Sequence, residues 1–564
     1  MPSHATREAA HRREHVVTRP VGFRGVWRDD AAARAVYAEA AGIAQVMPRA
    51  VAVPADADDV VTLVQWAAAA GAPLVARGSG SSMGGGAVGP GVVVDLGQLD
   101  DMGEVDVTGR RVRVGPGVLR ARVDAAARAH GLRFPVDPSS GEFCTVGGMA
   151  ATNAAGPHTL RFGPMRSWVM ALDCVFADGT RATVRRGQPL PTHVPALARL
   201  AELTGGAGRR SMLAAAPPAG VRKDASGYAV ADYARSGSVV DLLVGSEGTL
   251  ALFVGLELAL KPVPGATTCL LAAFPSLEAC VDAATIARDM HASACEMLDR
   301  TFLEAAVRGG SPLPVRADSE AVLLVETEGA DPAQAADRVR CIERAFLERG
   351  ASQTTVALHP GTVRRLWELR HRASPTLARL YPDRASMQFV EDGAVPPGNL
   401  PAYVRGVRAA LARQDTPGAI FGHAGDAHIH VNPLVDMRDP HWRDRVEAIL
   451  HEVAALTRQL GGTLTGEHGD GRLRAPLLAE LRGPTAMALF GRVKAAFDPN
   501  GILNPGVKLP LPGQRPVEAV KYDPALAPLP PEARDALDRV SRERLYATHR
   551  LSLLPAIPSD GPSA

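Results

Sequence analysis

Residues 73–96 of the chain read Pro-Leu-Val-Ala-Arg-Gly-Ser-Gly-Ser-Ser-Met-Gly-Gly-Gly-Ala-Val-Gly-Pro-Gly-Val-Val-Val-Asp-Leu. The pattern predicts a strand over 73–77, a loop of small residues over 78–86 and a second strand over 91–96. A Rossmann-type dinucleotide site needs a helix directly after the glycines, with its N-terminus directed at the pyrophosphate. Because a strand follows instead, the sequence disfavours a Rossmann fold. The backbone N–H groups of such a loop can still bind an anion.

Two more stretches of small residues lie in the same half of the chain. The first runs from 134 to 156 and contains Pro-Val-Asp-Pro-Ser-Ser and Thr-Val-Gly-Gly, and the second is Gly-Ser-Glu-Gly-Thr at 245–249. Small residues allow a backbone to approach a flat ligand closely and to donate N–H groups to it. Any one of these loops could be a flexible surface loop, but three together predict the lining of an extended cofactor.

Polar residues gather in two segments of the second half, Phe-Gly-His-Ala-Gly-Asp-Ala-His-Ile-His-Val-Asn at 421–432 and Gly-Thr-Leu-Thr-Gly-Glu-His-Gly-Asp-Gly at 462–471. In a strand, alternate side chains share a face, so His428, His430 and Asn432 point the same way. A turn at 425–426 can bring His423 back over that face. Several imidazoles and a carboxylate are costly to bury together, and a divalent metal is the usual compensation.

Glu467 and His468 are neighbours on a glycine-flanked segment, so one can bind a metal while the other stays free as an acid or base. The plainer alternative is that these groups make ordinary hydrogen bonds in a polar core or at the surface. A hydrolytic zinc site is a second alternative, because two histidines and a glutamate can also activate water.

The composition is that of an ordinary globular enzyme. The chain has 564 residues, enough for two or three domains, with a net charge of +2, 22% charged and 46% hydrophobic residues. Basic residues are not gathered in one run and aromatic residues are only 4%, so nothing indicates nucleic-acid binding.

The six cysteines are scattered without a Cys-x-x-Cys pair, which predicts reduced thiols in a cytoplasmic protein. Residues 1–19 lack the apolar segment of a secretory signal, and no apolar run reaches the roughly 18–20 residues of a membrane-spanning helix. Peripheral attachment at the inner membrane face and assembly as a homodimer are left open.

Seven motifs follow one another along residues 77–506. They are Arg-Gly-Ser-Gly-Ser-Ser-Met at 77–83, Pro-Val-Asp-Pro-Ser-Ser at 135–140, Thr-Val-Gly-Gly at 145–148, Gly-Ser-Glu-Gly-Thr-Leu at 245–250, His-Ala-Gly-Asp at 423–426, Gly-Glu-His-Gly at 466–469 and Phe-Asp-Pro-Asn-Gly-Ile-Leu-Asn-Pro-Gly at 497–506. With them, residues 45–510 resemble the FAD-linked oxidases, whose flavin domain is of the PCMH or vanillyl-alcohol-oxidase type. Within that family the resemblance is to the D-lactate, glycolate and D-2-hydroxyglutarate dehydrogenase branch.

Two further matches, Glu-Asp at 391–392 with Val-Pro at 395–396, and Gly-Asp-Gly-Arg at 469–472, resemble the subgroup in which the flavoprotein is fused to an iron–sulfur module. The cysteines of that module are not in this chain. The resemblance therefore implies that electrons leave for a separate acceptor, such as an iron–sulfur subunit, a quinone or a cytochrome.

The fold implied is α+β. Residues 45–265 would form a PCMH-type FAD-binding domain of two subdomains, and 266–510 an α+β substrate or cap domain with an antiparallel sheet, whose last part returns to the flavin. In this second part the pattern predicts alternating strands and helices, including a strand over 387–390. Residues 1–44 would be an N-terminal extension. Residues 511–564 are a Pro- and Ala-rich tail, expected to dock or to be solvated, with one helix near 531–546.

The resemblance also implies the site residues. FAD is expected to bind non-covalently, since the glycine-rich loop has no histidine where some relatives attach it. The implied cofactor-binding residues are Arg77, Gly78, Ser79, Gly80, Ser81, Ser82, Met83, Pro138, Ser139, Gly147, Gly148, Asn153, Gly156, Gly245, Glu247, Gly248 and Asn504.

The positions that match His423, His430 and Glu467 hold a divalent metal, usually zinc, in this branch of the family. His428 stands where relatives usually have Asn or a small residue, and it could add a ligand. The implied catalytic residues are the base His468, the substrate-carboxylate ligand Arg370, which lies in Trp-Glu-Leu-Arg at 367–370, and Asn432.

The expected reaction is oxidation of a small D-2-hydroxy acid of the D-lactate, glycolate or D-2-hydroxyglutarate type to the 2-oxo acid. Hydride would pass to flavin N5 and the hydroxyl proton to His468. A non-catalytic electron-transfer flavoprotein and an alcohol or sugar oxidase of the same fold remain alternatives. A zinc hydrolase is the least favoured alternative, because it leaves the three glycine-rich loops without a purpose.

Overall fold

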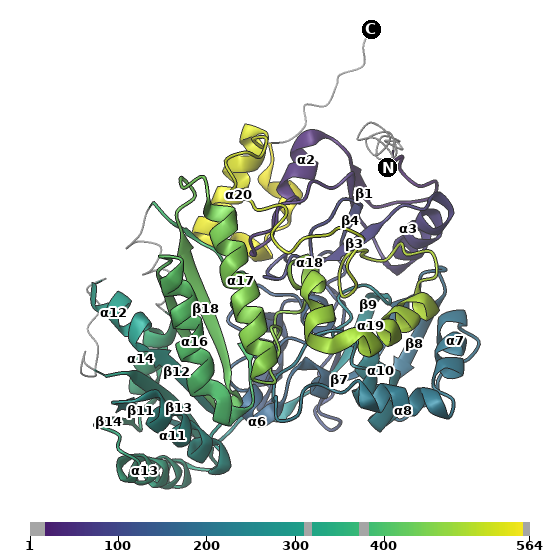
Figure 1. Ribbon diagram of the computed structural model, residues 1–564. Helices are drawn as coiled ribbons and strands as arrows, with labels where there is room; N and C mark the ends of the chain where they lie inside the picture. The colour runs from purple at the N-terminus through teal and green to yellow at the C-terminus, as the bar shows by residue number, and fades with distance from the viewer. Residues whose placement is uncertain (1–16, 309–318, 372–382, 556–564) are drawn as a thin grey trace.

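The computed structural model describes residues 17–308, 319–371 and 383–555. Within these residues the strands form four sheets, of four, two, eight and four strands, and helices cover them (Figure 1). The α+β class and the antiparallel sheet of the second half, both predicted from the sequence, are confirmed. The domain boundaries stay predictions.

The first sheet has the order β1-β2-β4-β3, and the loop of small residues at 78–86 connects two of its strands. Its strands are β1 (Val26–Arg28), β2 (Ala50–Val53), β3 (Leu74–Arg77) and β4 (Val92–Asp95). Helix α3 (Ala57–Ala70) begins after Asp56, whose side chain accepts from the backbone N–H groups of Asp58 and Asp59, and it ends at Gly71, which has left-handed backbone angles. Strand β4 pairs in parallel with both β2 and β3, so the loop 78–86 crosses from one strand to its parallel neighbour without a helix of its own.

The second sheet, with the order β5-β9-β7-β8, is antiparallel. Its strands are β5 (Arg111–Val114), β7 (Val169–Val175), β8 (Arg181–Arg185) and β9 (Leu252–Ala259), and β6 (Leu132–Arg133) pairs separately with β10 (Lys261–Pro262). Helix α19 (Leu478–Phe497) returns from the far end of the chain and packs Phe490 and Val493 into the core of this sheet. The C-terminal half thus contributes to the first half's core.

The eight-stranded sheet is antiparallel and belongs to the second half of the chain. Its strands are β11 (Ala266–Phe274), β12 (Ala294–Asp299), β13 (Ala321–Gly329), β14 (Gln353–Ala357), β15 (Ala385–Ser386), β16 (Gly393–Ala394), β17 (Gly418–His423) and β18 (His428–Val435). One face packs against α11 (Leu277–Asp289), α13 (Pro332–Glu348), α16 (Leu400–Arg413) and α17 (Trp442–Gln459), and the other against α12 (Arg300–Arg308) and α14 (Pro360–His371). The prediction of a strand over 387–390 is wrong. The strand lies two residues earlier, in β15, where it pairs with β18.

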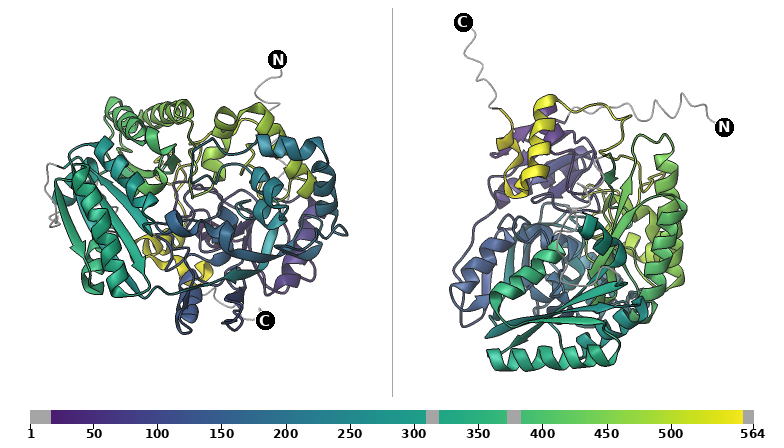
Figure 2. Two further views of the ribbon diagram at one scale, coloured as in Figure 1. Left: turned by 90° about the horizontal axis from the view of Figure 1, so that it is seen from below. Right: turned by 90° about the vertical axis from the view of Figure 1, so that its left-hand side faces the viewer.

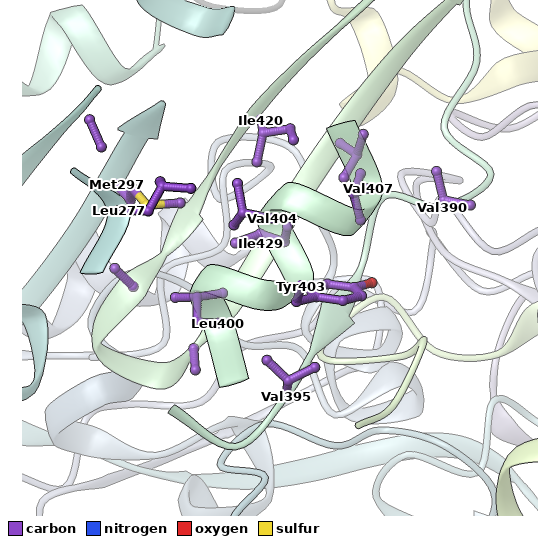
Figure 3. Close-up of a cluster of buried hydrophobic side chains, with 14 of the residues drawn as sticks. Leu277, Met297, Val390, Val395, Leu400, Tyr403, Val404, Val407, Ile420 and Ile429 are labelled. Carbon is purple, nitrogen blue, oxygen red and sulfur yellow. The ribbon is translucent and has the colours of Figure 1, made fainter. Parts of the chain in front are cut away.

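The hairpin of β17 and β18 gives the large sheet its two unlike faces. Ile420 and Ile429 lie on the face that packs with Val404 and Val407 of α16 (Figure 3). The register pairs His423 with His428 and Phe421 with His430, which places these side chains on the opposite face. The apolar contact with α16 therefore holds the hairpin while the histidines face away from it.

The C-terminal tail packs against the first sheet. Helix α20 (Pro531–Glu543) lies beside α2 (Ala31–Val36), and its Ala533 and Ala536 share a core with β2, β3 and β4. The right-hand view of Figure 2 shows the yellow tail against the purple N-terminal segment. Of the two expectations for the tail, docking is the one seen for its described part. Among the described helices, none has both the length and the apolar character needed to cross a membrane.

Candidate functional site

One cavity of about 960 Å³ joins the glycine-rich loops to the histidine hairpin. Its wall includes residues 78–83 and 137–145 of the first half of the chain, and His430, Asn432, Glu467 and His468 of the second half. A volume of this size lies at the upper end of the ~300–1,000 Å³ that ligand pockets usually span. Residues far apart in the sequence thus form a single site large enough for an extended ligand.

Three donor atoms form a near-equilateral triangle at one side of this cavity, contributed by His423 of β17, His430 of β18 and Glu467. Nε2 of His423 lies 3.2 Å from Oε1 of Glu467 and 3.3 Å from Nε2 of His430, and the third side, from His430 Nε2 to Glu467 Oε1, is 3.3 Å. A tetrahedral zinc ion with bonds of about 2.0–2.1 Å separates its ligand atoms by about 3.3–3.4 Å. The triangle therefore fits a divalent metal with three protein ligands and one open position.

Each member of this donor triangle is also hydrogen-bonded to a group outside the triangle. Glu296 accepts from Nδ1 of His423 at 2.5 Å, and the carbonyl of Glu391 accepts from Nδ1 of His430 at 2.9 Å. Lys223 donates to the other oxygen of Glu467 at 2.9 Å. Because these hydrogen bonds use the Nδ1 atoms, both Nε2 atoms point to the centre of the triangle. Hydrogen bonds of this kind orient histidine ligands in metal sites.

Electrostatics keeps the glutamate of the triangle ionised. Burial works against the charge on Glu467, but Lys223 and His423 hold its pKa well below the usual range. Glu296 is treated in the same way: its burial is outweighed by His423 and Arg370, and its pKa falls to about 2. Both carboxylates are therefore charged at neutral pH.

His428 lies beside the donor triangle, and its potential donor atom is within 4.8 Å of those of His423, His430 and Glu467. Its Nε2 is hydrogen-bonded to Asp392 at 2.8 Å, and its Nδ1 is buried without a hydrogen-bond partner. Burial lowers its pKa to about 3, so the ring is neutral at pH 7. A role for His428 as a further ligand stays a prediction.

His468 borders the cavity and is the most accessible imidazole of the group. Its side chain is 26% exposed, against 3% for His423, and its ring stacks on His430 with centroids 5.2 Å apart. Its Nδ1 lies 3.2 Å from Oε1 of Glu391, and its backbone N–H donates to Asp392 at 2.9 Å. Burial alone would lower the pKa of His468, but the negative charges of Asp392 and Glu391 raise it to about 9.

Arg370 and Asn432, the other two predicted catalytic residues, also line the cavity. Nε of Arg370 donates to Glu296 at 2.9 Å, and its guanidinium lies over the ring of Phe421 at 4.6 Å. Glu296 therefore links Arg370, the residue predicted to bind the substrate carboxylate, to His423, a predicted metal ligand.

The predicted cofactor residues divide into two groups. Those that line the cavity are Gly78, Ser79, Gly80, Ser81, Ser82, Met83, Pro138, Ser139, Gly148, Glu247 and Gly248. Those outside its lining are Arg77, Gly147, Asn153, Gly156, Gly245 and Asn504. Members of the second group support the loops: Asn504 donates from Nδ2 to the carbonyls of Gly86 and Glu247, and Asn153 accepts from the backbone N–H of Arg166.

The glycine-rich wall has features that fit FAD. Gly80 and Gly248 have φ values of 71° and 68°, which favour glycine and turn the loop backbone. The hydroxyl of Ser82 is buried without a hydrogen-bond partner, and so is Nη2 of Arg77. Unpartnered donors beside a loop of small residues are what a diphosphate would satisfy.

Several groups at the site were not assigned a role from the sequence. Glu296 could have been noticed as a single acid inside the apolar stretch Ala-Cys-Glu-Met-Leu at 294–298. His158, which also borders the cavity, is held between Asp137 at 2.5 Å and Glu326 at 2.6 Å. No local pattern predicts a role for His158 or Lys223, because their partners lie far away in the sequence.

Two family models match this chain. Residues 48–185 match the model of an FAD binding domain, and residues 263–507 that of the C-terminal domain of FAD linked oxidases. The chain is 30% identical over 484 residues to the glycolate oxidase subunit GlcD of Bacillus subtilis, covering 85% of this chain and 93% of that protein.

A second relative is longer than this chain. The D-2-hydroxyglutarate dehydrogenase of Pseudomonas putida is 31% identical over 560 residues, which are 93% of this chain but 54% of that protein. Among solved structures, 4-ethylphenol oxidase from Gulosibacter chungangensis has a similar fold, with a TM-score of 0.64 and 18% identity over 86% of this chain and 94% of that one.

Proposed function

The chain belongs to the family of FAD-linked oxidases, and from this premise we propose that it is a dehydrogenase that oxidises a small D-2-hydroxy acid to the 2-oxo acid. The observation that carries the proposal is the donor triangle, with His468 and Arg370 beside it in the cavity that the glycine-rich loops also line. A glycolate-, D-lactate- or D-2-hydroxyglutarate-type substrate offers a hydroxyl and an adjacent carboxylate, which suit a metal and an arginine.

His423, His430 and Glu467 would hold the metal, with zinc favoured by a nitrogen and oxygen donor set of this size. A bound divalent ion would supply Lewis-acid chemistry, lowering the pKa of a hydroxyl beside it. Bound FAD, lying along the glycine-rich loops, would supply the acceptor for a hydride. The edge lengths of the triangle support the metal, and the unpartnered donors at the loop support FAD.

The chain's own residues then orient the substrate and accept a proton. Arg370 binds the carboxylate, and Asn432 lies on the same strand face as His430 and borders the space where the substrate would sit. His468 accepts the hydroxyl proton at its imidazole, while Glu391 holds the ring and Asp392 holds the backbone N–H of the same residue.

A pKa of about 9 would keep His468 protonated at neutral pH, which is unsuitable for a base. That value belongs to a site without the charge of a metal ion. The pKa of His468 would fall with a dication held at the neighbouring triangle, because a second positive charge nearby disfavours the imidazolium. A metal at the triangle would therefore favour the neutral imidazole that the base role needs.

Delivery of the electrons to a separate acceptor, such as an iron–sulfur subunit, a quinone or a cytochrome, and a cytoplasmic location are part of the same proposal. The similarity to a subunit of glycolate oxidase supports the separate acceptor, since that relative is named as one part of an assembly.

The test is an anaerobic titration of the purified protein, followed by its visible spectrum. Bleaching of the flavin absorbance by one of glycolate, D-lactate or D-2-hydroxyglutarate, but not by L-lactate or L-2-hydroxyglutarate, is the expected result. Treatment with a chelator should remove the bleaching and leave the flavin bound, and added zinc should restore it. Bleaching that survives metal removal would contradict the metal-assisted reaction, and a protein that binds no FAD would overturn the whole proposal.

A further inference from the structure

The C-terminal tail reaches the cofactor cavity through a segment that none of the recognised motifs includes. The alanine face of helix α20 packs against the first sheet, and an ion pair at 2.8 Å between Arg534 and Glu39 holds the helix to the segment after α2. The segment that follows it, residues 544–550, therefore lies beside the loop 78–83. Arg544 and Tyr546 of this segment are part of the cavity wall.

An aromatic and cationic group forms where the tail meets the cavity. The ring of Tyr546 stacks on that of Phe143, with centroids 5.1 Å apart and planes 29° from parallel. The guanidinium of Arg544 lies 5.1 Å from the centre of the same Phe143 ring. Phe143 and Tyr546 both border the cavity, so this wall can accept a flat ring.

Arg550 ties the tail to the glycine-rich loop itself. Its Nη2 donates to the backbone carbonyl of Ser79 at 3.2 Å, and its side chain lies near the Tyr546 ring, 5.4 Å from the centroid. Its Nε is buried without a hydrogen-bond partner, as is Nη2 of Arg77. Arg550 is only 4% exposed and Arg77 2% exposed, so neither unpartnered donor belongs to a solvated side chain.

The surroundings of these two guanidinium groups are short of negative charge. Burial and the like charge of Arg77 lower the pKa of Arg550 to about 10. The acids near them are Asp95, which already accepts from the hydroxyl of Tyr37 at 2.5 Å, and, on the side of Arg77, Glu39, which already pairs with Arg534. Two buried cations that each keep an unpartnered donor, beside acids that already have partners, make a site that an anionic ligand would stabilise.

We propose that residues 544–550 are part of the FAD site, with Tyr546 covering a planar ring of the bound dinucleotide and Arg544 and Arg550 offsetting, together with Arg77, the charge of its diphosphate. The inference rests on the proposed function only in taking FAD as the ligand. It assigns a binding role to the tail, and it makes the last part of the chain a determinant of how tightly the flavin is held.

The test measures FAD binding to the apoprotein by flavin fluorescence, without any substrate. Tyr546→Ala and Arg550→Gln should each raise the dissociation constant about tenfold, in line with the energy of stacking on one aromatic side chain or of losing one buried positive charge beside the loop. Tyr546→Phe keeps the ring and should stay within about twofold of the wild type. Arg542→Ala, on the exposed side of α20 with a side chain 68% exposed, is the matched arginine control and should leave the constant unchanged.

Folding is followed separately by circular dichroism of each apoprotein. Arg544→Asn is the variant that spares the backbone, since Arg544 has a φ of 57° and Asn tolerates this left-handed conformation. This variant should raise the dissociation constant of FAD about threefold, the smaller effect expected of a more exposed cation. Titration with FMN and with ADP shows which half of FAD the tail contacts, because the affinity for that half alone falls in Tyr546→Ala.

The inference is overturned if folded Tyr546→Ala and Arg544→Asn both bind FAD as tightly as the wild type. In that case the proposed function stands, because the wild-type protein still binds the flavin. A wild-type protein that fails to bind FAD would instead defeat the proposed function and this inference together.

Discussion

The donor triangle and the loop 78–82 border one cavity, but side chains form the first and backbone forms the second. Around the triangle, buried charges have named side-chain partners: Lys223 pairs with Glu467, and Glu296 pairs with both His423 and Arg370. At the loop, the residues are glycines and serines that line the cavity. Removing a side chain should therefore damage the first region, whereas adding atoms should damage the second.

The largest effect is expected where a side chain takes part in the chemistry. His468→Ala should slow flavin reduction by at least about 100-fold, the lower range for loss of a general base, while FAD and metal stay bound. Stopped-flow reduction under anaerobic conditions measures it. His451→Ala, an exposed histidine of α17, serves as the matched control and should keep the wild-type rate. Reduction at full speed in the His468 variant would remove this residue from the mechanism.

An intermediate effect is expected behind the donor triangle. Glu296→Gln should weaken zinc binding about 10- to 100-fold, because the neutral amide no longer fixes the tautomer and orientation of His423. Competition with a chromophoric chelator gives the metal affinity. Glu278→Gln, an exposed glutamate of α11, is the control. Zinc affinity that is unchanged in the Glu296 variant would show that the triangle is held without this carboxylate.

The smallest effect is expected from a single added carbon at the loop. Gly80→Ala places a residue with φ near 71° in left-handed backbone, which costs about 1–2 kcal/mol, and its Cβ would come 2.4 Å from Nη2 of Arg77. Gly71→Ala has a similar φ of 63° but nothing within 4 Å, so it measures the backbone strain alone. In urea unfolding of the apoprotein, the Gly80 variant should lose more free energy of unfolding than the Gly71 variant.

FAD titration completes this comparison, because only the Gly80 substitution lies at the cavity. A lower FAD affinity is expected for Gly80→Ala and an unchanged one for Gly71→Ala. Equal losses of stability together with equal FAD affinities in the two variants would mean that the loop is not shaped around its ligand.

Local patterns predicted much of the fold. The strands on either side of the glycine-rich loop lie where the apolar runs and the glycines placed them. The face shared by His428, His430 and Asn432 follows from the period of a strand, and His423 joins it because the hairpin register places it opposite His428. The strand near 385–390 was misplaced because its pairing with the end of β18 outweighs the local apolar run.

The supporting groups of the site could not be predicted in the same way. Glu296 and Lys223 contact residues more than a hundred positions away, so only the packed sheet brings them to His423 and Glu467. The same holds for Tyr546 and Arg550, which reach Phe143 and Ser79 because α20 docks on the first sheet.

The sequence by itself determined which chemical groups this protein has and which short segments carry them, because motifs and periodicity act within a few residues. The tertiary structure alone decided the distances between those segments, and with them the 3.2–3.3 Å edges of the donor triangle and the tail's place at the cavity. The physical reason is that such distances are set by burial and pairing between residues remote in the chain, which no local pattern records.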